Sequence, residues 1–234
     1  MPLFSKIWYS NSEVRETKNT YKTLYRGGTG EIEEKKSRFI ADIRPAESEE
    51  EARSFVEEIS KKYWDARHHC YAYIIGEGAE IARASDDGEP SRTAGIPMLD
   101  VLRGEELCYA AAVVTRYFGG TLLGTGGLVR AYSEAVRAGL ANAEIITKVH
   151  GKHILLSADY SDLGGALRIL EARNIKVQNT EYAERVLVDA AAPFADFEKL
   201  GADITERSGG RIAIQEGAEC WLAETSEGIR IFDH

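Results

Sequence analysis

The sequence contains little cysteine and no long hydrophobic run. Its three cysteines, Cys70, Cys108 and Cys220, are an odd number, lie far apart and form no Cys-x-x-Cys pair. This spacing argues against a disulfide framework and against a structural zinc site, so we predict three reduced, mostly buried thiols. No apolar segment approaches the roughly 18–20 residues that a membrane-spanning helix needs, which predicts a soluble protein without a membrane partner.

Basic residues are also too few for a protein that coats nucleic acid. The formal net charge is −9, whereas non-specific binding to nucleic acid relies on many contacts between Lys or Arg and phosphate. Any RNA contact is therefore expected to be local. The first twenty residues lack a basic flank, a continuous apolar core and a small-residue cleavage site. No secretory signal is predicted, and the expected location is cytoplasmic.

The length of 234 residues suits one medium domain followed by one small domain. We predict an N-terminal arm over residues 1–20, a first domain over 21–148 and a second domain over 149–234. A glycine turn at Gly27-Gly28 and the capping-box spacing of Ser48 and Glu51 mark element boundaries in the first domain. The residue patterns predict strands around Leu24, Ile32 and 39–43 and at 70–76, 81–90 and 110–115, with helices after Ser48, at 96–104 and after residue 127.

The second domain starts a new pattern. Residues 143–151 are predicted to form a last strand or a connector, and 153–159 a separate strand. They are followed by a helix over 161–174 capped by Ser161, two strands within 175–192, a helix over 193–208 and a strand over 211–217. This β-α-β-β-α-β order is that of a ferredoxin-like unit, so the predicted fold class is α+β.

A glycine-rich stretch, GGTLLGTGG (residues 119–127), separates a buried strand from the start of a helix. Glycines let backbone amides approach a ligand closely, and the positive end of a helix favours an anion. Arg116 before the stretch and Arg130 after it would add positive charge. Together they predict a phosphate or carboxylate site, although the spacing matches neither a Walker loop nor a dinucleotide-binding loop. A tight turn with close helix–sheet packing explains the glycines equally well.

An acidic loop over residues 83–95 contains Asp86, Asp87 and Glu89. Three carboxylates within four positions are able to hold Mg²⁺ through oxygen ligands, or to hold nearby arginines through charge-assisted hydrogen bonds. A solvated acidic turn is the simpler alternative. Gly88 and Gly95, together with two prolines, restrict the backbone path, which favours a functional loop.

Two adjacent histidines, His68 and His69, enter the strand that contains Cys70. Neighbouring side chains of an extended chain point to opposite sides, so the two imidazoles are not expected to ligate one metal ion. The best catalytic hypothesis pairs one of these histidines with the acidic loop. No residue is assigned a catalytic role, and whether the protein is an enzyme stays open.

Several of these stretches resemble signature blocks of the YigZ/IMPACT family. The blocks are KSRFI (36–40), CYAY (70–73), SDDGEPS (85–91) followed by TAG (93–95), VTRYFGG (114–120) and GGLVRAY (126–132). Their number and order make the resemblance specific over about residues 20–145. The remainder is similar to the small C-terminal domain of two-domain bacterial members. The sequence departs from the family pattern at Arg92, at residues 67–69 and at Thr121-Leu122, where the family often has a lysine.

The resemblance implies a first domain with the ribosomal-protein-type β-α fold found in GHMP kinases and in domain IV of elongation factor G. It implies a ferredoxin-like second domain similar to domain V of that factor. By analogy, these two folds suggest a role that faces the ribosome or a nucleic acid. Eukaryotic relatives regulate translation through protein partners and lack the second domain.

We therefore expect translation-related regulation by binding RNA, a ribosomal component or a protein partner, without a cofactor or metal ion. The expected anion or RNA contacts are Arg116, Tyr117, Gly119, Gly120, Gly124, Gly126, Gly127 and Arg130, supported by Asp86, Asp87, Glu89 and Ser91. Tyr117 or Phe118 would stack a base if exposed. Homodimer formation is left open. One alternative is a metal-assisted hydrolase, or another enzyme acting on a phosphorylated or peptide-like substrate. Another is a protein-interaction scaffold.

Overall fold

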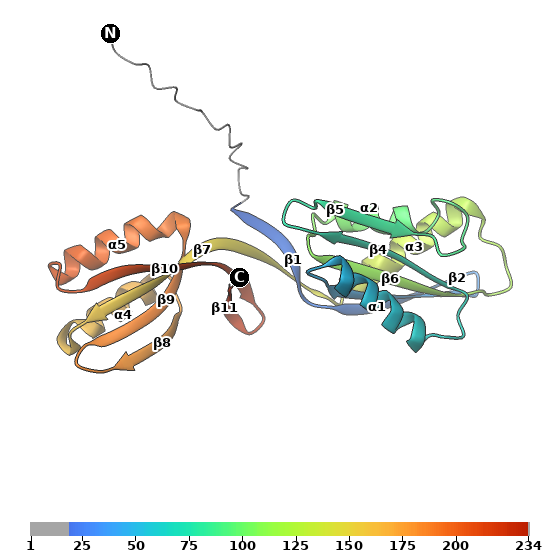
Figure 1. Cartoon of the computed structure of the whole chain (residues 1–234). Helices are drawn as coiled ribbons and strands as arrows, with labels where there is room; N and C mark the ends of the chain where they lie inside the picture. Colours follow the sequence, from blue (N-terminus) through green and yellow to red (C-terminus); the bar gives the residue numbers. More distant parts are fainter. Residues whose placement is uncertain (1–18, 234) are drawn as a thin grey trace, which may run out of the picture.

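Two antiparallel sheets, each covered by helices, form the protein in a computed structural model that describes residues 19–233 (Figure 1). Residues 1–18, most of the predicted arm, lie outside the described residues. The first part contains β1 (Thr20–Arg26), β2 (Gly28–Glu34), β3 (Ser37–Pro45), α1 (Glu49–Lys62), β4 (His68–Ile75), β5 (Ile81–Ser85), α2 (Gly95–Gly104), β6 (Ala110–Tyr117) and α3 (Gly124–Leu140). The second contains β7 (Glu144–Ala158), α4 (Tyr160–Ala172), β8 (Val177–Tyr182), β9 (Val186–Pro193), α5 (Phe194–Ser208), β10 (Ala213–Thr225) and β11 (Gly228–Asp233).

The first sheet has the strand order β2-β3-β6-β4-β5 and is buried on both faces. Because side chains alternate along a strand, Val114 and Ala112 of β6 join the core under α2 and α3, whereas Val113 and Ala111 pack with α1. Burial on both sides explains why β6 reads as a continuous apolar run. The predicted strands and helices of this domain are present, although β5 ends at Ser85 and α3 begins at Gly124, and the α+β class is confirmed.

Helix α1 begins where its sequence predicts. The Ser48 hydroxyl accepts a hydrogen bond from the Glu51 amide at 3.2 Å, and the Glu51 carboxylate accepts one from the Glu47 amide at 2.8 Å. Both bonds satisfy amides near the helix start that have no partner within the helix. Ala52, Phe55 and Ile59 are the buried residues of this helix.

The second sheet has the order β11-β10-β7-β9-β8, and β1 pairs with the first half of β7. Along the chain, the elements from β7 to β10 follow the order β-α-β-β-α-β. Helices α4 and α5 enclose a core with the strands, in which Ile154, Leu156, Val188, Leu170 and Leu200 are buried. The two strands and two helices predicted between residues 161 and 208 are confirmed, with small shifts of their ends.

Strand β7 corrects the prediction of two separate segments at 143–151 and 153–159. It is one continuous strand, and it contains the predicted domain boundary at residues 148 and 149. Within this strand, Gly151 is required by packing. A Cβ there would lie 2.3 Å from Leu222 Cδ1 and 2.5 Å from the Ala192 carbonyl oxygen.

Three further boundaries differ from the sequence prediction. Gly27 does not join a hairpin, since β1 pairs with β7 and β2 pairs with β3; a Cβ at Gly27 would lie 2.2 Å from the Ile43 carbonyl oxygen. The N-cap of α4 is Asp159 rather than Ser161. The predicted last strand at 211–217 is part of the longer β10, and β11 follows it. No helix within residues 19–233 is long and apolar enough to cross a bilayer.

Free thiols occur as predicted. Cys70, Cys108 and Cys220 are all buried and none forms a disulfide. Burial raises the pKa of Cys70 and, to about 11, that of Cys220. These thiols are therefore uncharged at neutral pH and behave as small apolar core residues.

We predict that His153 stabilises the second sheet in a pH-dependent way. Its Nδ1 lies 3.1 Å from Asp189 Oδ1 and its Nε2 lies 3.0 Å from Asp233 Oδ1. Burial alone would lower the pKa of His153, but the hydrogen bonds to these carboxylates raise it overall. The resulting stabilisation is present below the unfolded-state pKa of about 6.5 and is lost as pH rises through the folded-state value.

The measurement is the free energy of urea unfolding of wild type and His153→Gln. We expect the variant to be destabilised more at about pH 5.5 than at about pH 9. An equal loss at both values would contradict a charged imidazole between the two carboxylates.

Candidate functional site

The stretches singled out in the sequence meet at one end of the first sheet. Strand register places Arg116 of β6 opposite His68 of β4, and Tyr117 opposite Arg38 of β3. The loops before β3 and β4 therefore lie beside the loop after β6, and the β5–α2 loop reaches the same end (Figure 1). We call this region, formed by residues 35–38, 63–68, 85–95 and 116–127, the loop end.

A buried ion pair connects these loops. Arg116 Nη1 donates to Glu89 Oε1 at 2.6 Å, and the two side chains are only 7% and 3% exposed. The Tyr132 hydroxyl of α3 donates to the same carboxylate oxygen at 2.8 Å. Ser37 accepts from Arg116 Nη2 at 3.4 Å and from the Gly119 amide at 3.1 Å. One buried polar network thus connects the acidic loop with β3, β6 and α3.

Asp86 organises the acidic loop from within. Its carboxylate accepts from the backbone amides of Arg92, Ala94 and Gly95 at 2.7, 3.0 and 2.9 Å. Burial alone would raise the pKa of Asp86, but these amides and the Arg92 charge lower it overall. Gly95 must be glycine because a Cβ there would lie 2.7 Å from the Ser85 amide nitrogen. The Asp86 carboxylate therefore satisfies backbone amides at the start of α2.

Asp87 links the acidic loop to β4. Its carboxylate accepts from the His69 amide at 2.6 Å, and its carbonyl oxygen lies 2.7 Å from His68 Nδ1. The His69 imidazole lies between two segments, with Nε2 3.1 Å from the carbonyl oxygen of Tyr63 and Nδ1 4.0 Å from Asp87 Oδ2. The structure brings the acidic loop and both histidines together, largely through backbone atoms. Among residues 19–233, no three or more His, Cys, Asp or Glu side chains are placed to hold a metal ion.

The glycine-rich stretch divides into a loop and a helical turn. Helix α3 begins at Gly124, so the predicted loop is shorter than the glycine pattern suggested. Gly119 packs closely, since a Cβ there would lie 2.0 Å from the Lys36 carbonyl carbon. Gly120 and Gly124 have φ values of +83° and +71°, a region that favours glycine. At Gly126, by contrast, a Cβ would meet nothing within 4 Å, so the first turn of α3 is open on that side.

The start of α3 receives no side-chain cap. Leu123 occupies the N-cap position without a side-chain hydrogen bond, and the first turn contains no acidic residue. The first amides of a helix have no acceptor within the helix and carry partial positive charge. Arg130 lies six positions further along α3 and is exposed. An anion placed here would meet free amides and positive charge.

The structure adds basic residues that the sequence prediction did not weigh. Lys35 and Lys36 form the two-residue turn between β2 and β3, with φ values of 47° and 65°, and both are exposed. Two positive φ values at the centre of a two-residue hairpin are the signature of a type I′ turn. The KK pair between two strands was visible in the sequence, but its contact with Gly119 requires the fold.

The loop end also exposes aromatic rings. Trp64 is 81% exposed and Phe118 is 52% exposed. Tyr117 is half-buried, and its hydroxyl donates a hydrogen bond to Asp65 Oδ1 at 2.7 Å. This hydrogen bond raises the pKa of Tyr117. Ser91 is exposed on the acidic loop.

Comparison with known proteins shows similarity along most of the chain. The model of the Impact N-terminal domain matches residues 35–140, and that of a domain of unknown function, DUF1949, matches residues 156–211. IMPACT family member YvyE of Bacillus subtilis is 38% identical over 91% of this chain and 98% of its own length. IMPACT family member YigZ of Escherichia coli is 38% identical over 77% of this chain and 89% of its own.

Two further comparisons bear on the two parts of the chain. The Protein IMPACT homolog of Dictyostelium discoideum is 38% identical over 44% of this chain and 30% of its own length. A solved structure described as "Crystal structure of an hypothetical protein" is 36% identical, with a TM-score of 0.56 over 86% of this chain and 98% of that one. That similarity supports the two-domain α+β architecture.

We predict that the Glu89–Arg116 pair is a strong structural constraint. Glu89→Leu should destabilise the protein by about 3–5 kcal/mol, because it leaves the Arg116 charge buried without a counter-charge. Combining it with Arg116→Met should destabilise less than Glu89→Leu alone, since no unpaired charge remains. Urea unfolding measures both free energies.

The matched control is the exposed pair Arg38–Glu31, whose Nε and Oε1 lie 2.5 Å apart in the same sheet. Its side chains are 51% and 46% exposed, so Glu31→Gln should cost less than about 1 kcal/mol. A double variant destabilised as much as Glu89→Leu alone, or more, would contradict the predicted coupling.

Proposed function

The chain belongs to the IMPACT family, and on this premise we propose that it is a translation-related regulatory protein that binds RNA, free or within the ribosome, through its loop end. Family membership supports the regulatory role at the level of the family. The RNA contact is proposed from the arrangement of charge at the loop end. No cofactor or metal ion is part of the proposal.

The observation that supports the proposal is a separation of charges. Two carboxylates of the acidic loop, those of Asp86 and Glu89, are turned inward, on backbone amides and on Arg116, whereas the Asp87 side chain is 48% exposed and accepts from the His69 amide. Basic side chains around them have no carboxylate within ion-pair distance in the part of the chain that the structure describes. These are Lys35, Lys36, Arg67, Arg92 and Arg130, and all five are exposed. Glu33 and Glu34 of β2 lie near the turn and reduce this charge, which limits the positive surface to a local patch.

Backbone amides would complete the phosphate contact. The uncapped start of α3 and the open side of Gly126 allow an oxyanion to approach the first helical turn. Arg130 is on the same helix, about 9 Å from its start at 1.5 Å per residue. Consecutive RNA phosphates could therefore contact Arg130, the helix start and the Lys35–Lys36 turn in succession. Arg116 is buried by Glu89, so we assign it a positioning role.

Exposed rings would add a contact to the bases. Single-stranded RNA is commonly held by aromatic stacking together with positive charge along the backbone. Trp64 and Phe118 are exposed at the loop end, next to Arg67 and the glycine loop in the sequence. A flat stacking surface of this kind binds RNA with little sequence preference.

The fold types implied by the family resemblance support the same direction. We assign the first domain to the ribosomal-protein-type β-α fold and the second, with sheet order β10-β7-β9-β8, to the ferredoxin-like fold. Domains IV and V of elongation factor G have these two types, which is an analogy of fold rather than of site.

We predict that the double variant Lys36→Ala/Arg130→Ala binds single-stranded RNA more weakly and with less salt dependence. Each lost phosphate contact on a single strand should reduce the slope of log K against log salt by about 0.7, so two should reduce it by about 1.4. Fluorescence anisotropy with a labelled oligonucleotide across a salt series measures both quantities.

The control is Arg103→Ala/Arg207→Ala, which removes two exposed arginines outside the loop end. This control changes the net charge by the same amount as Lys36→Ala/Arg130→Ala. Should both double variants lose the same affinity and slope, binding would depend on overall charge, and the proposed site would be wrong.

A further inference from the structure

A cavity of about 550 Å³ lies where the two domains meet, at the end of the first sheet opposite the loop end. Strands β1 and β7 run side by side through this junction (Figure 1). Its volume is within the range of small-ligand sites, which often form between domains. Its lining combines aromatic rings from both domains with four charged residues, Glu47, Glu77, Lys148 and Asp233.

Aromatic rings make up much of the cavity wall and are fixed by one another. The Tyr21 ring packs edge-on against Trp221 with centroids 4.7 Å apart, and against Tyr109 with centroids 5.6 Å apart. Phe232 of β11 packs against the same cluster. The first domain supplies Tyr109 and the second supplies Trp221 and Phe232. Such rings provide a rigid apolar surface for a planar or aliphatic group.

Lys148 brings a positive charge into this aromatic setting. Its Nζ lies 4.3 Å from the centroid of the Phe232 ring and 5.6 Å from that of Tyr21. No carboxylate within the described residues lies at ion-pair distance from it. Burial lowers the pKa of Lys148, although the charges of Glu47 and Glu77 act in the opposite direction. An ammonium group has three donors, and ring faces do not replace an oxygen acceptor.

Two carboxylates face the same cavity without a donor. Within residues 19–233, the side chains of Glu47 and Glu77 form neither a salt bridge nor a hydrogen bond. Burial is the largest cause of the raised pKa of Tyr21, and the nearby charges of Glu47 and Glu77 raise it further. A simple anion would be repelled by these carboxylates and by Asp233, and a simple cation would leave the Lys148 ammonium without an acceptor.

We propose that this cavity binds a small zwitterion, an α-amino acid with an aromatic side chain. Its carboxylate would accept hydrogen bonds from Lys148, its ammonium group would donate to Glu47 and Glu77, and its ring would pack against Tyr21, Tyr109 and Trp221. A neutral ligand with separated charges satisfies both kinds of group. The proposal does not depend on RNA binding, because β6 alone separates the two sites by about 24 Å.

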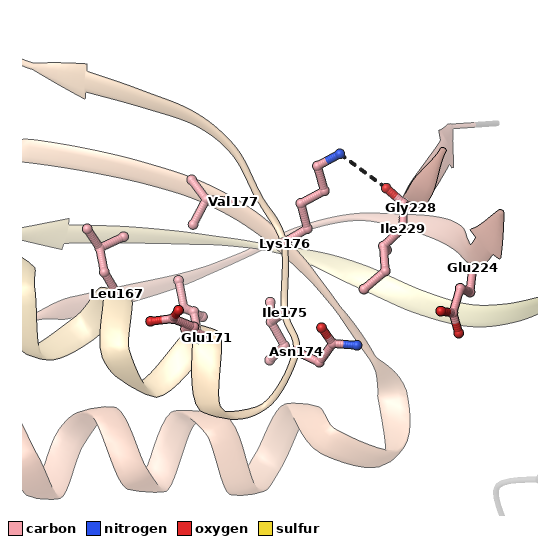
Figure 2. Close-up of a pocket in the computed structure, with 10 residues that line it drawn as sticks. Leu167, Glu171, Asn174, Ile175, Lys176, Val177, Glu224, Gly228 and Ile229 are labelled. Atoms are coloured by element: carbon pink, nitrogen blue, oxygen red, sulfur yellow. Dashed lines mark hydrogen bonds between the residues drawn. The ribbon is translucent and has the colours of Figure 1, made fainter. Parts of the chain in front are cut away.

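A second cavity, of about 480 Å³, serves as a comparison because it lacks this combination of charges. It lies beside α4 and is lined by apolar residues such as Leu167, Ile175 and Ile229. Figure 2 shows that the Lys176 ammonium is already used, donating to the Ile229 carbonyl oxygen at 3.3 Å. Glu171 and Glu224 lie on opposite sides of this cavity (Figure 2). It offers no convergent set of unpaired charges.

Isothermal titration calorimetry of the full chain with three related compounds tests the proposal. L-phenylalanine carries both charges, phenylalaninamide lacks the carboxylate and N-acetylphenylalanine lacks the ammonium group. We expect L-phenylalanine to bind and each blocked compound to bind at least about tenfold more weakly, because each loses a charge-assisted contact. No binding of L-phenylalanine up to about 1 mM would overturn the proposal, as would equal binding of phenylalaninamide.

Variants of the lining residues then test which residue contacts each charged group of the ligand. Lys148→Met should weaken L-phenylalanine about tenfold and leave phenylalaninamide unchanged. Glu77→Gln should weaken phenylalaninamide and leave N-acetylphenylalanine unchanged. The matched control is Lys152→Met on the same strand, whose ammonium pairs with Glu216 at 2.7 Å outside the cavity. If Lys152→Met weakens L-phenylalanine as much as Lys148→Met, the proposed contact is wrong.

Discussion

The buried ion pair between Glu89 and Arg116 is the constraint on which the loop end depends. Removing two charges from water costs free energy. The attraction between them offsets this cost only if the geometry is good and further hydrogen bonds satisfy the remaining polar atoms. Tyr132, Ser37 and the Gly119 amide provide that geometry, and they come from α3, β3 and the glycine loop. The acidic loop is therefore an internal part of the domain, and its position determines where the neighbouring backbone lies.

This internal use of carboxylates explains how an acidic protein presents a local basic surface. The net charge of −9 opposes general attraction to nucleic acid. Because Asp86 and Glu89 are turned inward, the lysines and arginines around them face solvent, and five of them have no carboxylate at ion-pair distance within the described residues. The junction between the domains differs in kind: Lys148, Glu47 and Glu77 line an aromatic cavity and form no ion pair within the described residues. One end of the first sheet suits a phosphate chain and the other a small zwitterion.

Local signals predicted much of this structure, and non-local packing accounts for the rest. The start of α1 follows from Ser48 and Glu51, which lie three residues apart. The continuity of β7 was not predicted, and Gly151 within it is glycine because of close contacts with Leu222 and Ala192, far along the chain. The candidate loops were found from their glycines and carboxylates. The burial of Arg116 was not predicted, since arginine is usually exposed and only the fold brings Glu89 to it.

Amide hydrogen exchange of the full chain, with and without single-stranded RNA, tests the central claim most directly. RNA should slow exchange at the β2–β3 turn and across residues 119–127, where free amides face the proposed phosphates. Exchange around residues 145–149 and 221–232 should stay the same, because the domain junction lies at the opposite end of the sheet. Protection confined to the junction or to the second domain, or no protection at saturating RNA, would contradict an RNA-binding loop end.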